Sequence, residues 1–179
     1  MALKATIFKA HLKLADIDRA YYADHTLTLA RHPSETDERM MIRLLAFAIH
    51  ASDCLQFTRG LSTDQEPDLW QKNLQGEIET WIELGQPDIK RLRKASKLAT
   101  QVFVYNYGGG AEHWWVKNNK EVAQLRNLQI FNLPGVETQQ LASLADRNMH
   151  LEITVQDGQL LVSTAGNCIN IAPQALITD

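Results

Sequence analysis

The sequence predicts a mixed α/β fold of the α+β kind, in which a central mixed sheet with flanking helices follows an N-terminal β-hairpin. Three observations predict it. Apolar and polar residues alternate over residues 4–14 and again over 21–30, which is the period of half-exposed strands. Two later segments have helical periodicity. Short runs rich in β-branched and aromatic residues separate and follow those segments.

The opening hairpin follows from the alternation. Residues 4–14 place one set of apolar side chains on a single face, namely Phe8, Ala10, Leu12 and Leu14. The polar loop "ADIDR" follows, and residues 21–30 then alternate in the same way. The second strand is therefore expected to return antiparallel to the first.

The segment "HPSETDERMMIRLLAFAIHA" changes to the helical period. Ser34 and Asp37 resemble a capping box, and apolar residues recur on one face from Met41 to Ala48. Three strands are predicted next, at "LQFTRG", "PDLWQK" and "EIETWIEL". Asp88 then suits the N-cap of a helix at "IKRLRKASKLA", and "TQVFVYNYGGG" reads as a strand before a glycine-rich loop. The predicted core order is α, β, β, β, α, β.

The remaining elements complete the pattern. A helix is predicted at 111–124, a strand at 127–133, a helix at 137–146 and a hairpin at 150–164 that turns at Asp157 and Gly158. The tail "NCINIAPQAL" suits an edge strand. With no repeat, linker or shift in composition, residues 1–179 are predicted to form a single domain.

Composition limits the classes of protein. Apolar residues at 45% and charged residues at 22% are ordinary for a soluble protein, and no run is long and apolar enough to span a membrane. The N-terminus lacks the apolar core of a secretory signal, so a cytoplasmic protein is expected. Cys54 and Cys168 are expected to be buried, reduced thiols. A net charge of −3 means that nucleic acid would need a local basic patch.

Glu83 raises the main question about function. It lies between Ile82 and Leu84 in a strand predicted to be central, and a charge there costs free energy unless it is paired or bound. If its face of the sheet is exposed, Glu83 needs no partner. If helices cover that face, the candidate partners are a metal ion or the lysines of the next helix, which are Lys90, Lys94 and Lys97. The spacing of those lysines favours a solvated helix face.

Two further carboxylates are candidate ligands. Glu38 lies on the side of its helix near the buried stripe, although a first-turn carboxylate is also favoured by the helix dipole. Asp68 follows Pro67 at the start of a predicted strand, where an aspartate is also common in turns. Converging carboxylates suit Mg²⁺ or Mn²⁺, and a nearby lysine would stabilise charge on a phosphate. Such a set is a phosphodiester hydrolysis site.

The stretches "LTLARHPSETDERMMIRLLAFA", "LQFTRGLS", "EPDLW" and "WIELGQPD" closely resemble the bacterial YaeQ family, and the likeness runs through the whole chain. The resemblance implies a variation on the PD-(D/E)XK, or restriction-endonuclease-like, core. Carried over, the acidic residues of that motif are Glu38, Asp68 and Glu83. Gly85 stands where the motif has its lysine, and the resemblance implies a replacement from the following helix, first Lys94 and then Lys90.

Two hypotheses about function follow. The first is a Mg- or Mn-dependent phosphodiesterase (nuclease) acting on DNA or RNA, in which Glu38, Asp68 and Glu83 bind the metal and Lys94 completes the catalytic set. Mutual repulsion is then expected to raise the pKa of the metal-free carboxylates. The alternative is a catalytically inactive module that binds nucleic acid or a protein partner, which Gly85 and the net negative charge favour. No membrane partner is expected.

Other sequence patterns add little to these hypotheses. The six histidines lie in no nucleophile elbow or HExxH pattern, and no Walker A loop is present. Of the adjacent Trp114 and Trp115, one is predicted to enter the core and the other is left open, because successive helical residues point about 100° apart.

Overall fold

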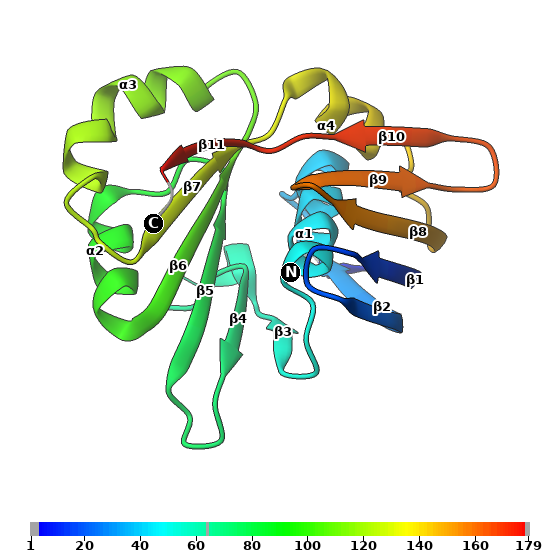
Figure 1. The fold of residues 1–179 in the computed structure, drawn as a ribbon, viewed down its shortest axis with the longest axis horizontal. Helices are drawn as coiled ribbons and strands as arrows, with labels where there is room; N and C mark the ends of the chain where they lie inside the picture. Colours follow the sequence, from blue (N-terminus) through cyan, green and yellow to red (C-terminus); the bar gives the residue numbers. More distant parts are fainter. Residues whose placement is uncertain (1–3, 64, 178–179) are drawn as a thin grey trace. The chain divides into compact units, whose positions relative to one another are not determined.

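The computed structural model describes residues 4–63 and 65–177, and the chain divides into two compact units, each built on one sheet (Figure 1). Unit 1 comprises Met1–Ile49 and Val136–Pro173, and unit 2 comprises His50–Gly135 and Gln174–Asp179. Both sheets combine parallel and antiparallel pairs, and helices accompany the strands. The expected mixed α+β fold is confirmed, whereas the single domain over 1–179 stays a prediction.

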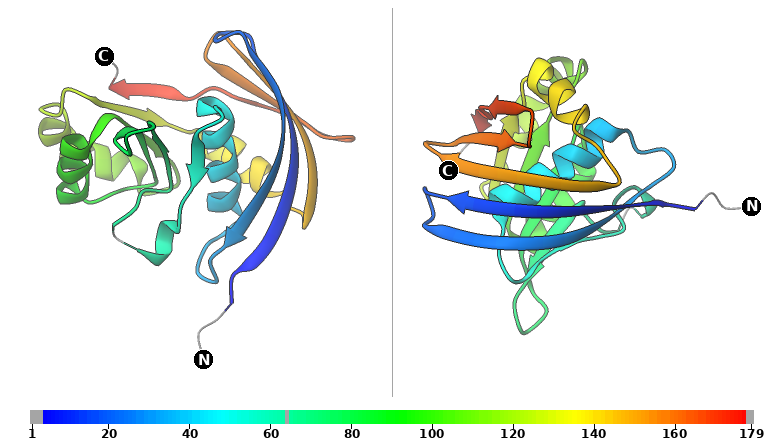
Figure 2. Two further views of the ribbon diagram at one scale, coloured as in Figure 1. Left: turned by 90° about the horizontal axis from the view of Figure 1, so that it is seen from below. Right: turned by 90° about the vertical axis from the view of Figure 1, so that its right-hand side faces the viewer.

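Unit 1 contains a five-stranded sheet of order β10-β9-β8-β1-β2. Its elements are β1 (Thr6–Asp16), β2 (Tyr21–Arg31), α1 (Asp37–His50), α4 (Gly135–Ala142), β8 (Asn148–Gln156), β9 (Gln159–Ser163) and β10 (Cys168–Ile171). The β1–β2 hairpin is antiparallel over its whole length, as predicted. Helix α1 lies against one face of the curved sheet (Figure 2), where the ring of Phe47 meets His25 edge-on at 5.2 Å between centroids.

The start of α1 differs from the prediction. Oγ1 of Thr36 accepts the N–H of Arg39 at 3.1 Å, so Thr36 is the N-cap. Ser34 instead places its hydroxyl 2.7 Å from Nδ1 of His32. The capping box predicted from Ser34 and Asp37 is therefore wrong by two residues, because a threonine that also suits the cap lies closer to the first helical turn.

Unit 2 contains a six-stranded sheet of order β11-β7-β6-β5-β4-β3. Its elements are β3 (Leu55–Phe57), η1 (Gly60–Ser62), β4 (Leu69–Lys72), β5 (Ile78–Leu84), α2 (Ile89–Leu98), β6 (Ala99–Asn106), α3 (Ala111–Val122), β7 (Leu128–Asn132) and β11 (Gln174–Ile177). β5, β6 and β7 are parallel, and α2 and α3 connect them. The order from α1 to β6 is the predicted α, β, β, β, α, β.

Both connecting helices cover the same face of the unit 2 sheet. One buried cluster joins Trp81 of β5, Leu92 and Ala95 of α2, and Trp114 and Val122 of α3. Asp88 caps α2 as predicted, since its Oδ1 accepts the N–H of Lys90 at 2.7 Å. Trp114 is the tryptophan in the core, and Trp115 packs half-buried against the same cluster.

The C-terminal tail supplies an edge strand to each sheet, first β10 in unit 1 and then β11 in unit 2.

Both cysteines are exposed free thiols, so the expectation that they are buried is wrong. Cys168 alternates with the buried Ile169 and Ile171 and lies on the outer side of the edge strand β10, whereas Cys54 lies in a turn before β3. Among the described helices, none is long and apolar enough to cross a membrane.

The two leucines of α2 provide a test of this packing. Leu92 is fully buried and Leu98 is 50% exposed. Leu92→Ala should lower the free energy of unfolding by about 2–5 kcal/mol because it leaves a cavity under the helix. Leu98→Ala, the matched control, should change it by less than about 0.5 kcal/mol. Urea unfolding of both variants measures the difference, and equal effects would contradict the assigned helix face.

Candidate functional site at the carboxyl end of β5

Glu83 lies at the end of β5 on the face that α2 and α3 cover. It shares that face with Trp81, two residues earlier, and its side chain is 5% exposed. Nε1 of Trp81 donates to Oε1 of Glu83 at 2.7 Å, and Nε of Arg91 donates to the same oxygen at 2.6 Å. The alternative of an exposed Glu83 is therefore wrong. The basic partner that the buried charge requires is Arg91.

Arg91 connects three segments of unit 2. It projects from the first turn of α2, and besides Glu83 its Nη2 donates to the carbonyl oxygen of Glu66 at 2.6 Å. The guanidinium group suits this role because its donors have a fixed, planar arrangement. The Arg91 side chain is 22% exposed, whereas its partner carboxylate is almost entirely covered.

Asp68 lies immediately before β4, and its carboxylate is held against the backbone of β5. Oδ2 accepts the N–H of Leu84 at 2.9 Å, and the N–H of Asp68 donates to the carbonyl of Ile82 at 3.0 Å. A Cβ added at Gly60 would lie 3.3 Å from Oδ1, so a glycine there leaves room for the carboxylate. The bonded residues flank Glu83, and the structure therefore brings Asp68 and Glu83 together.

The environment raises the pKa of Glu83 above its ordinary value of 4.5. Burial is the largest cause, because removing water disfavours the charged form. Arg91 lowers the pKa by its hydrogen bond and its charge, and the charge of Asp68 raises it. The expected repulsion between carboxylates therefore contributes at Glu83, but it is a smaller effect than burial.

Gly85, which stands where the resemblance implied a lysine, has a backbone conformation that favours glycine. Its φ is +86°, in the left-handed region that side chains other than glycine rarely adopt, and its N–H donates to the carbonyl of Tyr105 at 2.9 Å. A Cβ here would lie 3.7 Å from Cε1 of Tyr107, so space is not the obstacle. The backbone conformation itself disfavours a lysine at this position.

The three lysines of α2 are exposed, as their spacing favoured. Lys94 donates from Nζ to Oε1 of Gln65 at 2.7 Å. Gln65 adjoins Glu66, whose carbonyl accepts from Arg91, so both cations hold the same loop before β4. The pairing of Glu83 with Lys94, one of the two alternatives for its partner, is replaced by the pairing with Arg91.

Glu38 belongs to unit 1, where it has a partner of its own. Oε1 of Glu38 accepts the hydroxyl hydrogen of Thr138 at 2.7 Å, and Thr138 is fully buried on α4. The structure thus groups Asp68 and Glu83 in unit 2, whereas Glu38 as their companion stays a prediction. Among residues 4–63 and 65–177, no group of three or more His, Cys, Asp or Glu side chains has the arrangement of a metal centre.

Arg91 is the functional candidate that sequence reasoning missed. A signal was present, because Arg91 lies four residues before the buried Ala95 and next to the buried Leu92. Residues four apart share one face of a helix, so Arg91 borders the buried stripe instead of the solvated one. A basic residue at that border, eight positions after a buried glutamate, is the pattern that indicates the pair.

The raised pKa of Glu83 predicts how stability depends on pH. Above pH 4.5 the unfolded chain loses the Glu83 proton while the folded protein still holds it, so wild-type stability falls relative to Glu83→Gln as pH rises through the folded pKa. Glu79→Gln, at an exposed carboxylate on the same strand, is the matched control. Urea unfolding at a series of pH values from 4.5 upward measures the free energy of unfolding of each protein. If this free energy depends on pH in the same way in the wild type and in Glu83→Gln, the raised pKa of Glu83 is contradicted.

The conformation of Gly85 predicts a cost for any side chain. Gly85→Ala should lower the free energy of unfolding by about 1–3 kcal/mol, since alanine must adopt a positive φ. Gly135→Ala is the control, because Gly135 has open space around its Cα and is not among the glycines with positive φ. Thermal or urea unfolding compares the two variants, and an unaffected Gly85→Ala would show that the turn relaxes.

Comparison with known proteins agrees with the resemblance seen in the sequence. The model of the YaeQ protein family matches residues 1–173. The YaeQ proteins of Salmonella typhi and Escherichia coli (strain K12) are 48% and 45% identical over 172 residues, which cover 96% of this chain and 95% of each relative. The crystal structure of YaeQ from Xanthomonas axonopodis pv. citri has a TM-score of 0.94 at 44% identity, covering 98% of this chain and 99% of that one. The crystal structure of YaeQ from Pseudomonas syringae also has a TM-score of 0.94, at 35% identity, and the match covers 98% of this chain and 97% of that one. The chain belongs to the YaeQ family.

Proposed function

We propose that this protein is a Mg²⁺- or Mn²⁺-dependent phosphodiesterase with a variant PD-(D/E)XK site, acting on DNA or RNA. The observation that carries the proposal is the pair of buried carboxylates, Asp68 and Glu83, at the carboxyl end of a strand in a parallel β5–β6–β7 arrangement. Ligand sites in open α/β sheets lie at this end of the strands. Burying two neighbouring carboxylates costs free energy, because their charges repel, and a bound cation would offset that repulsion.

The donor set fits a hard divalent cation. Among residues 4–63 and 65–177, the two side chains that donate to Glu83 both bind Oε1, so Oε2 is available to a cation. Mg²⁺ is commonly bound by one or two carboxylates together with waters and substrate phosphates, so Asp68 and Glu83 suffice as protein ligands. The metal would polarise the phosphate and lower the pKa of a bound water. Glu38 is proposed as a further ligand on the strength of the family resemblance.

The basic residues of α2 would act on the phosphate. Arg91 is held beside Glu83 and reaches the surface, so its guanidinium can stabilise negative charge next to the carboxylates. Lys94, one helical turn farther on, is proposed to lie near the scissile phosphate. Together they take the part of the motif lysine, which the left-handed conformation of Gly85 disfavours at its usual place.

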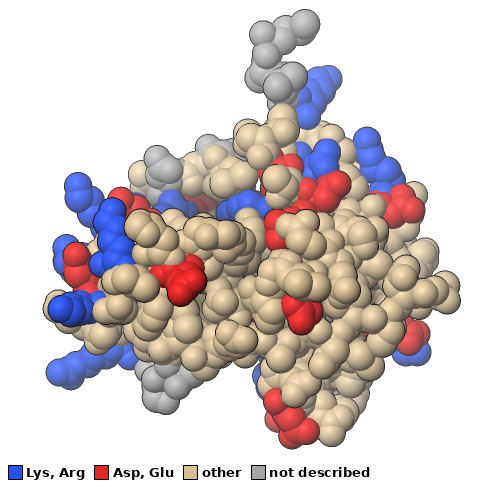
Figure 3. Space-filling model, turned by 90° about the horizontal axis from the view of Figure 1, so that it is seen from above, with Lys and Arg blue, Asp and Glu red and all other residues tan. Residues whose placement is uncertain are grey.

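A specific observation favours a second candidate function. Glu83 already has two donors, which is the arrangement expected of a satisfied structural carboxylate. In addition, the exposed Lys90, Lys94 and Lys97 make a local basic surface on a chain of net charge −3. Figure 3 shows Lys and Arg side chains at the left edge, where Figure 1 places α2 and α3. A catalytically inactive module that binds nucleic acid, or a protein partner, would use this surface.

Titration of Mn²⁺ by calorimetry tests the first proposal. The wild-type protein should bind Mn²⁺, and Asp68→Asn and Glu83→Gln should each abolish binding because either change removes a charged ligand. Glu79→Gln should bind as the wild type does, since Glu79 is exposed on the same strand and bonds Gln71. Circular dichroism of each variant confirms that it is folded.

Activity separates the two functions. Labelled single- and double-stranded DNA and RNA, incubated with the protein and Mn²⁺, should be cut by the wild type and by Glu79→Gln but not by Glu83→Gln. If the wild type neither binds Mn²⁺ nor cuts any of these substrates, the phosphodiesterase proposal fails. Binding of uncut nucleic acid that is lost in Lys90→Glu would then favour the inactive module.

A further inference from the structure

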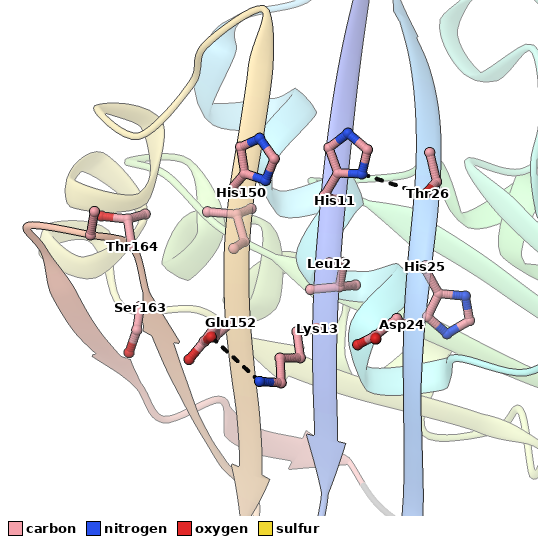
Figure 4. Close-up of a pocket in the computed structure, with 12 residues that line it drawn as sticks. His11, Leu12, Lys13, Asp24, His25, Thr26, His150, Glu152, Ser163 and Thr164 are labelled. Carbon is pink, nitrogen blue, oxygen red and sulfur yellow. Dashed lines mark hydrogen bonds and ion pairs between the residues drawn. The ribbon is translucent and has the colours of Figure 1, made fainter.

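A pair of histidines lies on the outer face of the unit 1 sheet, far in sequence from the carboxylates. His11 on β1 and His150 on β8 are direct partners in the parallel register. Their rings stack with centroids 4.7 Å apart and planes 11° from parallel (Figure 4). Both side chains are exposed, whereas the next residues, Leu12 and Leu151, are buried on the opposite face. The pair is therefore presented to solvent by two rigid strands.

Thr26 supports one ring of the pair. It lies opposite His11 in the antiparallel register of β2, and its Oγ1 is 3.4 Å from Nδ1 of His11. When Nδ1–H donates to that hydroxyl, Nε2 of His11 carries the lone pair and can bind a metal. Within the described part of the chain, His150 has no hydrogen-bond partner, so no protein group occupies the ring nitrogen that a metal would bind.

The surroundings favour a cation. The histidines border a hollow of about 630 Å³ on the sheet surface, which Lys13, Asp24 and Glu152 also line. Lys13 and Glu152 form a loose, exposed ion pair of 3.8 Å, so Glu152 remains accessible to another positive charge. Among the residues that line the hollow, two carboxylates, Asp24 and Glu152, accompany one ammonium group, Lys13.

We propose that His11 and His150 form a binding site for a borderline transition-metal ion such as Zn²⁺, with waters completing the coordination shell. Neutral imidazole suits Zn²⁺, Ni²⁺ and Cu²⁺ but not Mg²⁺, which prefers oxygen. A Zn–N distance of about 2.0–2.1 Å requires the two rings to tilt toward each other. Because both rings are exposed, no core packing opposes that tilt.

Binding at this site would stabilise unit 1. The ion joins β1 to β8, which are paired in the fold although they lie more than a hundred residues apart in the chain. An ion that binds the folded protein more tightly than the unfolded chain raises the stability in proportion to the logarithm of its concentration. Thermal unfolding therefore reports the site without any assay of activity.

Zn²⁺ titration into the full chain tests the inference. With Mg²⁺ in excess at the proposed carboxylate site, the wild type should bind one Zn²⁺ by calorimetry, and Zn²⁺ should raise its Tm. His11→Gln and His150→Gln should each abolish this binding and the rise in Tm, and these exposed substitutions leave the core intact. His113→Gln, at an exposed histidine of α3, and Asp68→Asn should both retain them. The Asp68→Asn result separates this site from the proposed Mn²⁺ site.

The inference is overturned if the wild type binds no Zn²⁺, or if the double variant His11→Gln/His150→Gln binds it as tightly as the wild type. Nuclear magnetic resonance of the imidazole groups gives an independent result. Zn²⁺ should shift the signals of His11 and His150 and leave that of His113 in place. A shift confined to other histidines would contradict the site.

Discussion

The pairing of Glu83 with Arg91 is the interaction on which the architecture of unit 2 depends. A carboxylate placed among Trp81, Leu84 and the covering helices loses its hydration, and only a charged donor offsets much of that loss. The pair fixes α2 on β5 at its first turn, and the second donor group of the arginine fixes the loop before β4. Asp68, at the end of that loop, is thereby held beside Glu83.

One consequence is that the structural and functional interpretations of Glu83 are not exclusive. Among the described residues, the two donors to Glu83 both bind the same oxygen of its carboxylate. A ligand oriented by such donors loses little freedom on binding a metal, which is how surrounding hydrogen bonds assist metal sites generally. The same bonds also hold the side chain in place without any ligand, which is what the inactive module requires.

Much of this arrangement could be predicted from the sequence where the signal is local. Periodicity identified the order of helices and strands, and capping chemistry identified the N-cap at Asp88, because each depends on a few neighbouring residues. The burial of Glu83 stayed open, because it depends on which face of the sheet the distant helices cover. The three lysines mark the exposed side of α2 and give no sign of Arg91, which borders the buried side of the same helix. Nothing local indicates that β1 pairs with β8 or that the tail serves both sheets, since such pairings are decided by packing between distant segments.

The parallel pairing of β1 with β8 has a consequence for how the chain is made. Residues 50–135 of unit 2 lie between the two segments of unit 1, so the opening hairpin emerges from the ribosome long before its partner strand exists. Until β8 is synthesised, the edge of β1 is unpaired, and such an edge can pair with other chains and lead to aggregation. Unit 2 in turn receives its edge strand β11 only after the last strand of unit 1, β10, has been synthesised. Neither unit can therefore be separated from the other by a single cut in the gene.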